Sequence, residues 1–170
     1  MKKLVMFAAV AVMSVVASAT SVKWGVATDK PLADISSGAA YLVYGTLPTK
    51  WEAESFSKST LTTAGLQVLA EGAIDSGVYW NGTGDSLTPT STGLDKGNKT
   101  VYMIAISSDG KTLDVSGGKT LNLQASALST SLSWNGASDF TKYAATVPEP
   151  TSALLMVLGV AGLALKRKRA

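Results

Sequence analysis

Three segments of the chain place an aspartate five residues after a tryptophan, in the frame apolar-x-Trp-x4-Asp. An exposed indole ring stacks on the face of a sugar, and a carboxylate accepts hydrogen bonds from hydroxyls or coordinates calcium. One interpretation is therefore a row of exposed rings that binds carbohydrate or another surface. The pairs are Trp24 with Asp29, Trp80 with Asp85, and Trp134 with Asp139.

A structural interpretation of the same frame stays open beside that one. Each tryptophan would pack into the core where a strand ends, and the aspartate would cap the turn that follows. The spacings of 56 and 54 residues between the tryptophans also fit a decayed internal duplication. No D-x-D-x-D-G loop is present, so the sequence predicts no metal site.

Catalytic groups are scarce in this chain. It has no cysteine and no histidine, which removes a thiolate nucleophile, a Ser-His-Asp arrangement and nearly every zinc site. Glu52 and Glu54 would face the same way on a strand, where a carboxylate pair can act in acid–base catalysis but is more often a solvated face. We therefore expect no enzyme, no catalytic residue and no cofactor.

The excess of positive over negative charge lies at the two ends of the chain. The whole sequence has a net charge of +3, yet residues 20–147 hold nine lysines, no arginine and eleven acidic residues, a net charge of −2. Nucleic-acid-binding proteins cluster Lys and Arg against phosphates. The sequence therefore predicts no nucleic-acid partner, and the basic ends are interpreted as topological signals.

The last residues form three consecutive blocks. Pro148, Glu149 and Pro150 make a stiff triplet, because proline fixes φ and disfavours helix in the residue before it. Residues 153–165 are an uncharged apolar run of 13 residues, which as a helix reaches about 20 Å across about 30 Å of hydrocarbon. The four basic residues that follow resist crossing a membrane. They are Lys166, Arg167, Lys168 and Arg169.

This order of blocks, VPEP, then Thr-Ser, the apolar run and KRKR, resembles the PEP-CTERM sorting signal of Gram-negative bacteria over residues 147–170. The resemblance implies that exosortase, an integral-membrane cysteine protease, recognises Pro148, Glu149 and Pro150. It would process the tail and pass the protein to the outer surface. Residues 151–165 would then be a temporary transmembrane helix and residues 166–169 its cytoplasmic stop. An ordinary single-span anchor is the alternative.

The first 19 residues are typical of a secretory signal peptide. Lys2 and Lys3 precede a 13-residue apolar stretch, and Ala17 and Ala19 then mark cleavage before Thr20. An uncleaved signal anchor is disfavoured, because the apolar stretch is short. We therefore expect passage through the Sec translocon, cleavage by signal peptidase, and one exported domain at residues 20–146.

Short apolar segments separated by Gly, Ser, Thr and Pro predict a mainly β domain, a small antiparallel β-sandwich with one or two short helices. The segment 100–107 is apolar on both faces and should be a central strand, which Asp109 and Gly110 should turn into the next one. The expected strands are residues 20–27, 39–47, 73–80, 100–107 and 111–115.

Four segments are less regular. Residues 51–58 are interpreted as an edge strand or turn, and residues 59–70 as a short helix capped by Ser59 or Thr60. Residues 81–98 are expected to be a long loop, functional or mobile. Residues 121–132 fit either a strand or a helix by their apolar spacing.

Together these features predict an exported bacterial protein that is held for a time in the inner membrane. It would then reside at the cell surface or in the extracellular matrix. The resemblance implies a structural or adhesive role linked to biofilm and exopolysaccharide, without catalysis. The alternative is a carbohydrate- or surface-binding module that uses the exposed Trp and Asp residues of the three frames.

Overall fold

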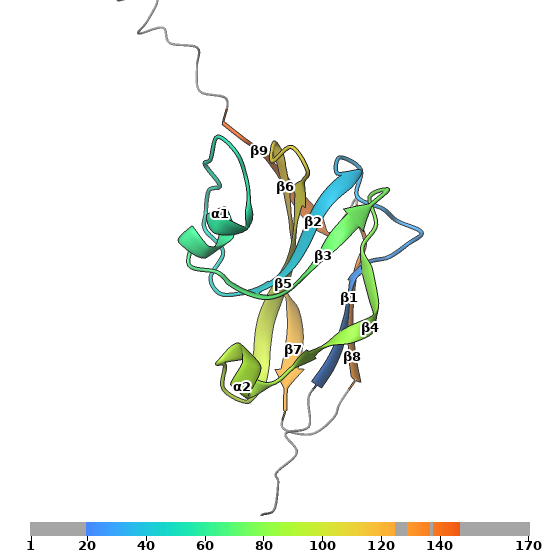
Figure 1. Ribbon diagram of the computed structural model, residues 1–170, viewed down its shortest axis with the longest axis vertical. Coiled ribbons are helices and arrows are strands. Elements are labelled where there is room, and N and C mark those ends of the chain that lie inside the picture. Colours follow the sequence, from blue (N-terminus) through green and yellow to red (C-terminus); the bar gives the residue numbers. More distant parts are fainter. Residues whose placement is uncertain (1–19, 125–128, 137, 147–170) are drawn as a thin grey trace, which may run out of the picture.

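The computed structural model describes residues 20–124, 129–136 and 138–146, which form two stacked β-sheets and two short helices (Figure 1). The expected mainly β fold with two sheets and few helices is confirmed. No helix in these ranges has the length and apolar character needed to cross a membrane. The expected signal peptide and the expected membrane helix at 151–165 lie outside the described residues.

The smaller sheet has the strand order β4-β1-β8. Its middle strand β1 (Thr20–Val26) pairs antiparallel with β4 (Trp80–Leu87) and parallel with β8 (Ser129–Trp134). The predicted strand at 20–27 is confirmed. The expectation of a purely antiparallel sandwich is wrong, because β1 and β8 are parallel. A parallel pair needs a long connection, and the strands β5, β6 and β7 of the larger sheet lie between β4 and β8 in the sequence.

The larger sheet has the order β3-β2-β5-β6-β9, and β7 pairs with the other half of β5. The strands predicted at 39–47, 100–107 and 111–115 are confirmed, and β5 is central as expected. The strands are β3 (Gln67–Asp75), β2 (Ser37–Tyr44), β5 (Gly97–Ser107), β6 (Thr112–Ser116), β7 (Lys119–Leu123) and β9 (Phe140–Ala144).

Strand β5 is apolar on both faces because it lies between two cores. Met103 and Ala105 point into the core between the sheets, beside the inward residues of β1. Ile104 and Ile106 point the other way, into a second cluster on the outer face of the larger sheet. Alternate residues of a strand face opposite sides, so one apolar run serves both layers.

The second cluster is covered by the segment that precedes β3. The helix α1 (Lys58–Thr63) buries Leu61, and the loop before it buries Trp51 and Phe56. The edge strand considered for 51–58 is therefore wrong, and the turn alternative fits the loop. The helix expected in 59–70 is confirmed only for its first half, because the second half belongs to β3.

A tight turn interrupts the strand predicted at 73–80. Ser76 and Gly77 have φ values of +52° and +76°, and Asp75 and Val78 exchange two backbone hydrogen bonds of 3.0 and 2.9 Å. Two consecutive positive φ values are typical of a type I′ hairpin turn. The chain thereby leaves the larger sheet at β3 and enters the smaller sheet at β4.

The long loop predicted at 81–98 is also wrong. It contains most of β4, followed by the helix α2 (Pro89–Thr92). Thr88 accepts a hydrogen bond from the Ser91 N–H at 2.8 Å, with proline at the first helical position and Gly93 left-handed after the end, as expected for helix caps. In 121–132 the strand interpretation holds for β7 and β8, and residues 125–128 lie outside the description.

The turn at Asp109 and Gly110 is confirmed, although only Gly110 has a positive φ, +69°. The Asp109 carboxylate accepts hydrogen bonds from the Ser107 hydroxyl at 2.6 Å and from the Lys111 N–H at 2.9 Å. These bonds lower the pKa of Asp109. The turn at Ser76 reverses the chain with two consecutive positive φ values. The turn at Asp109 has only one, and the hydrogen bonds of the Asp109 carboxylate stabilise the reversal instead.

Gly25 is predicted to be irreplaceable where β1 and β4 touch. Its φ is +150°, and a Cβ there would lie 2.0 Å from the Tyr79 carbonyl oxygen. Gly25→Ala should lower the free energy of unfolding by more than about 2 kcal/mol, through strain and displacement of β4. Urea unfolding followed by circular dichroism measures this loss.

The matched control is Gly117→Ala, because a Cβ at Gly117 meets nothing within 4 Å. That variant should stay within about 0.5 kcal/mol of the wild type. Equal effects of the two substitutions would contradict the close approach of β1 and β4.

Candidate functional site

The three Trp–Asp frames meet in one sheet, because Trp24, Trp80 and Trp134 lie on β1, β4 and β8. Their side chains do not share a face. Trp24 and Trp134 are 0% and 1% exposed, whereas Trp80 is 40% exposed. The row of exposed rings is therefore wrong for Trp24 and Trp134, which belong to the core between the sheets, and only Trp80 remains open to a ligand.

The Trp24 ring is held by a carboxylate from the second frame. Its Nε1–H donates to Asp85 Oδ2 at 2.5 Å, and the Asn81 amide donates to the same oxygen at 2.8 Å. Asn81 Oδ1 in turn accepts from the Gly84 N–H at 2.8 Å. Asn81 and Asp85 thus clamp a bulge in β4, which shifts the pairing with β1 between Val22 and Trp24.

The third frame follows the capping interpretation. Asp139 Oδ2 accepts from the Asn135 N–H at 2.9 Å, which lowers the pKa of Asp139. The Trp134 Nε1–H donates to the Gly117 carbonyl at 2.9 Å, and Lys119 Nζ lies 5.6 Å from the ring centroid. Asp29 lies exposed in the turn after β1. Asp85 and Asp139 therefore accept hydrogen bonds that stabilise the fold itself.

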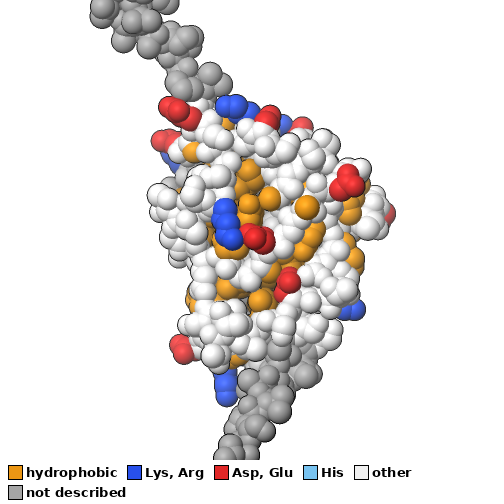
Figure 2. Space-filling model, viewed as in Figure 1, with side chains coloured by type: hydrophobic (Ala, Val, Ile, Leu, Met, Phe, Trp, Pro, Cys, Tyr) orange, Lys and Arg blue, Asp and Glu red, His pale blue; other side chains and the backbone are white. Residues whose placement is uncertain are grey.

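Two shallow grooves lie on the outer side of the larger sheet. One, of about 460 Å³, is lined by Trp51, Glu52 and the start of α1. Glu52 lies 3.9 Å from Lys50 in a solvated pair, and no strand aligns it with Glu54. The other, of about 370 Å³, lies over β2 and β3, where hydrophobic side chains reach the surface (Figure 2).

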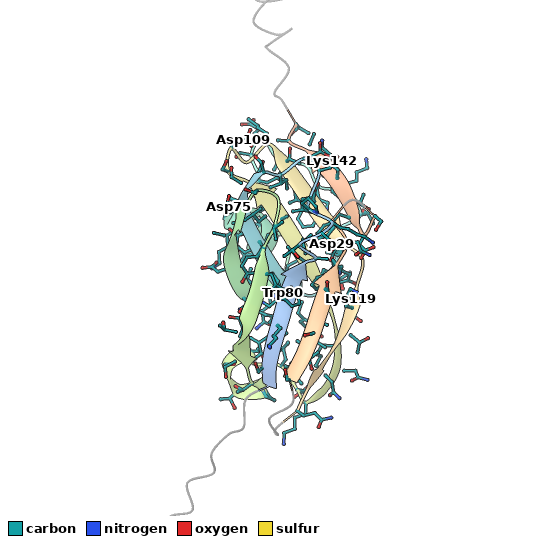
Figure 3. All side chains as sticks on the ribbon, turned by 90° about the vertical axis from the view of Figure 1, so that its right-hand side faces the viewer. Asp29, Asp75, Trp80, Asp109, Lys119 and Lys142 are labelled. Carbon is teal, nitrogen blue, oxygen red and sulfur yellow. The ribbon has the colours of Figure 1, made fainter. Side chains whose placement is uncertain are left out.

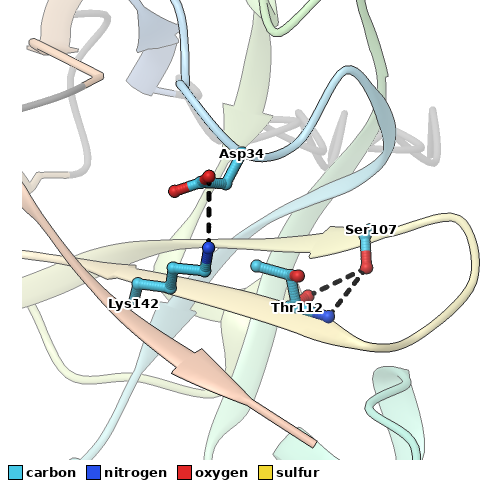
Figure 4. Close-up of polar contacts among 4 residues, drawn as sticks. All are labelled: Asp34, Ser107, Thr112 and Lys142. Carbon is cyan, nitrogen blue, oxygen red and sulfur yellow. Dashed lines mark hydrogen bonds and ion pairs between the residues drawn. The ribbon is translucent and has the colours of Figure 1, made fainter.

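A buried carboxylate lies beneath the loop between β1 and β2. Asp114 is 5% exposed, and its Oδ1 has no hydrogen-bond partner. Burial and the charge of Asp34 raise the pKa of Asp114 to about 6, against the opposing charge of Lys142. Lys142 Nζ lies 3.1 Å from Asp34 Oδ1 (Figure 4).

Sequence analysis missed Asp114 for a simple reason. In TLDVS it alternates with Leu113 and Val115, which predicts a solvated position on the polar face of an outer strand. The loop and Lys142 of β9 cover that face, and neither is near Asp114 in the sequence. No group of three or more acidic residues that could hold a metal occurs in the described ranges.

The end of the described domain is tied down up to Thr146. The Ala145 N–H donates to the Lys111 carbonyl at 2.8 Å, and the Thr146 N–H donates to the Ala53 carbonyl at 2.8 Å. In Figure 1, β1 begins at the end of the molecule where α2 lies, whereas β9 ends at the opposite end. The proline triplet begins two residues after Thr146.

Residues 146–169 match the PEP-CTERM protein-sorting motif. The chain therefore carries a PEP-CTERM sorting motif. The motif implies an exported protein that is processed by exosortase, a membrane-associated enzyme, on its way to the cell surface. No curated protein and no solved structure shows significant similarity to the chain.

The predicted sorting residues of this motif lie outside the described residues, and their individual roles stay predictions. The same holds for Ala17 and Ala19 of the expected signal peptidase site, while Thr20 is the first residue of β1. The sorting residues are Pro148, Glu149, Pro150, Lys166, Arg167, Lys168 and Arg169.

Asp85→Ala should lower the free energy of unfolding by about 1–3 kcal/mol, because it leaves the Trp24 Nε1–H without its acceptor. Combined with Trp24→Phe, which removes the donor, it should cost less than the two single losses added together. Urea unfolding of the four proteins measures the coupling. Strict additivity would show that the hydrogen bond does not stabilise the fold.

Asp114 should make the protein more stable in mild acid. The pKa of Asp114 in the folded protein is about 6, above the ordinary 3.8, so the folded state holds the proton more tightly than the unfolded state. The resulting contribution to the free energy of unfolding is complete below pH 3.8 and is lost as the pH rises through 6. Asp114→Asn should therefore be more stable than the wild type by about 2 kcal/mol at pH 7 and equally stable near pH 4.

Urea unfolding at several pH values between 4 and 7 measures this difference. Asp95→Asn, at an exposed position, is the matched control and should follow the wild-type profile. Parallel profiles for Asp114→Asn and the wild type would contradict the buried carboxylate.

Proposed function

We propose that this protein works at the cell surface or in the extracellular matrix, in a structural or adhesive role linked to biofilm or exopolysaccharide, and that it has no catalytic activity. A cleavable signal peptide directs it to the Sec translocon. The C-terminal helix then holds it briefly in the inner membrane, until exosortase acts near Pro148, Glu149 and Pro150. The observation that carries this proposal is the sorting motif at residues 146–169.

The way the domain ends supports a sorting signal that acts separately from it. Backbone hydrogen bonds hold the chain to Thr146, the first residue of the matched motif. The proline triplet starts at Pro148, two residues along the sequence from this last hydrogen-bonded residue. The two described sheets are built from strands between Thr20 and Ala144, so the folded part can be complete while the tail is processed.

Composition supports a role without catalysis. The whole sequence lacks cysteine and histidine, and the buried Asp114 is enclosed by a loop and by Lys142 and does not open into either groove. Two stacked sheets with a second apolar cluster give a rigid body, which suits a structural or adhesive role.

Replacement of Glu149 tests the sorting. In the native host, Glu149→Gln should leave the protein unprocessed in the inner-membrane fraction, with the mass of the full tail. The reason is that the triplet loses its charged centre between two prolines. Mass spectrometry of the membrane, outer-surface and medium fractions measures this outcome.

The matched control is Glu54→Gln, an exposed glutamate in the loop before α1. It should be processed and released like the wild type. An unchanged mature mass and unchanged surface release for Glu149→Gln would refute recognition of the triplet by exosortase.

A further inference from the structure

The outward face of the smaller sheet has an unusual set of side chains. The large apolar residues of its strands, such as Trp24, Leu132 and Trp134, point inward, whereas the outward positions are almost all short. Across the sheet they align in register, because Ser21 pairs with Ser86 and Ser129, and Gly25 pairs with Trp80 and Ser133. We call this surface the serine face; it comprises Ser21, Lys23, Gly25, Trp80, Ser86, Ser129, Ser131 and Ser133.

Trp80 is the one large hydrophobic side chain in the described residues that is exposed, at 40%. It lies on the serine face in Figure 3, where the smaller sheet is turned toward the viewer. Its neighbours leave it bare, since Gly25 lies opposite on β1 and Gly82 lies two residues along β4. A Cβ on Gly82 would lie 3.5 and 3.6 Å from the ring atoms Nε1 and Cδ1.

The backbone beneath this ring is held rigidly. Tyr79, just before it, accepts a hydrogen bond from the Val26 N–H at 2.8 Å, and its ring packs on Trp24 with centroids 4.6 Å apart. Asn81, just after it, belongs to the clamp with Asp85. A ring on a fixed backbone loses little entropy when a ligand stacks on it.

We propose that the serine face binds a neutral polysaccharide of β-linked pyranose rings, with one sugar stacked on Trp80. The C–H face of a pyranose packs against an indole ring, and its hydroxyls bond to Ser133 and to the neighbouring serines in the row. Ser133 lies two strands from Trp80, about 10 Å away at the usual strand spacing. Gly25 lies between them, buried and without a side chain that would rise above the sheet, which leaves a low floor for an extended glycan.

The chemistry of the face favours a sugar over other partners. A stable contact with a second copy needs a larger apolar centre than one ring among serines. Lys23 is the single charged residue of the serine face, so an anionic polymer finds little to pair with. The proposal goes beyond the surface role above and does not depend on how the tail is processed.

Tryptophan fluorescence tests this on the full-length chain in a detergent without a sugar headgroup. The chain has four tryptophans. Trp80 is exposed, whereas Trp24, Trp51 and Trp134 are buried and should respond little to a ligand at the surface. Cellohexaose, laminarihexaose and mannohexaose are the probes. At least one should shift the emission to the blue and reduce acrylamide quenching. Trp80→Ala should weaken its binding about tenfold or more, while Trp80→Tyr keeps a stacking ring and most of the affinity.

Ser133→Arg provides a second variant that leaves the ring in place. Its long side chain should cover Gly25 and weaken binding, whereas Thr141→Arg, at an exposed position on β9 of the other sheet, should not. Isothermal titration measures binding where the tryptophan is changed. Loss of binding in Trp80→Ala and Ser133→Arg, with retention in Thr141→Arg, supports the proposal.

Three outcomes overturn it. The first is no binding of any probe by the wild type, and the second is equal binding by Trp80→Ala. The third is a dimer, seen by size-exclusion chromatography with light scattering, that Trp80→Ala abolishes, because this assigns the face to a second copy. None of these outcomes bears on the Glu149 experiment, so the sorting proposal and the glycan proposal fail separately.

Discussion

Tyr79 joins the two sheets, and two glycines make the space that it occupies. A Cβ on Gly72 of β3 would lie 1.9 Å from the Tyr79 ring, and a Cβ on Gly25 of β1 would lie 2.0 Å from its carbonyl oxygen. The ring also packs on Trp24. Burial, with the nearby charge of Asp85, raises the pKa of the Tyr79 hydroxyl. The larger and smaller sheets are thereby locked together where the chain passes between them.

The exposed ring of Trp80 follows from this joint. With Tyr79 turned inward between the sheets, the next side chain along the strand must point outward. The pairing of β4 with β1 contains a bulge, and the hydrogen bonds of Asn81 with Asp85 and Gly84 stabilise it. An outward tryptophan on a serine-rich sheet is thus a consequence of how the chain crosses from one sheet to the other.

Several elements could be predicted because their signals are local. The strand β5 follows from a run of apolar residues on both faces, and the turn after it follows from Asp109 and Gly110. The strand β4 was missed, since NGTGD has the composition of a loop, and its pairing with β1 contains a bulge. The turn at Ser76 was missed because apolar residues continue in alternation on both sides of it. The edge-strand alternative for residues 51–58 was wrong because Trp51 and Phe56 are buried in the second apolar cluster, which no local pattern reveals.

By itself the sequence determined the sorting motif, because the motif is a linear order of triplet, apolar run and basic residues that can be read without a folded context. It also showed that the three Trp–Asp frames share one spacing, since the pattern is visible in the letters. Only the tertiary structure decided that Trp24 and Trp134 are buried while Trp80 is exposed. The physical reason is that the face a strand residue occupies depends on register, and a bulge or a crossing between sheets changes the register by contacts far away in the chain.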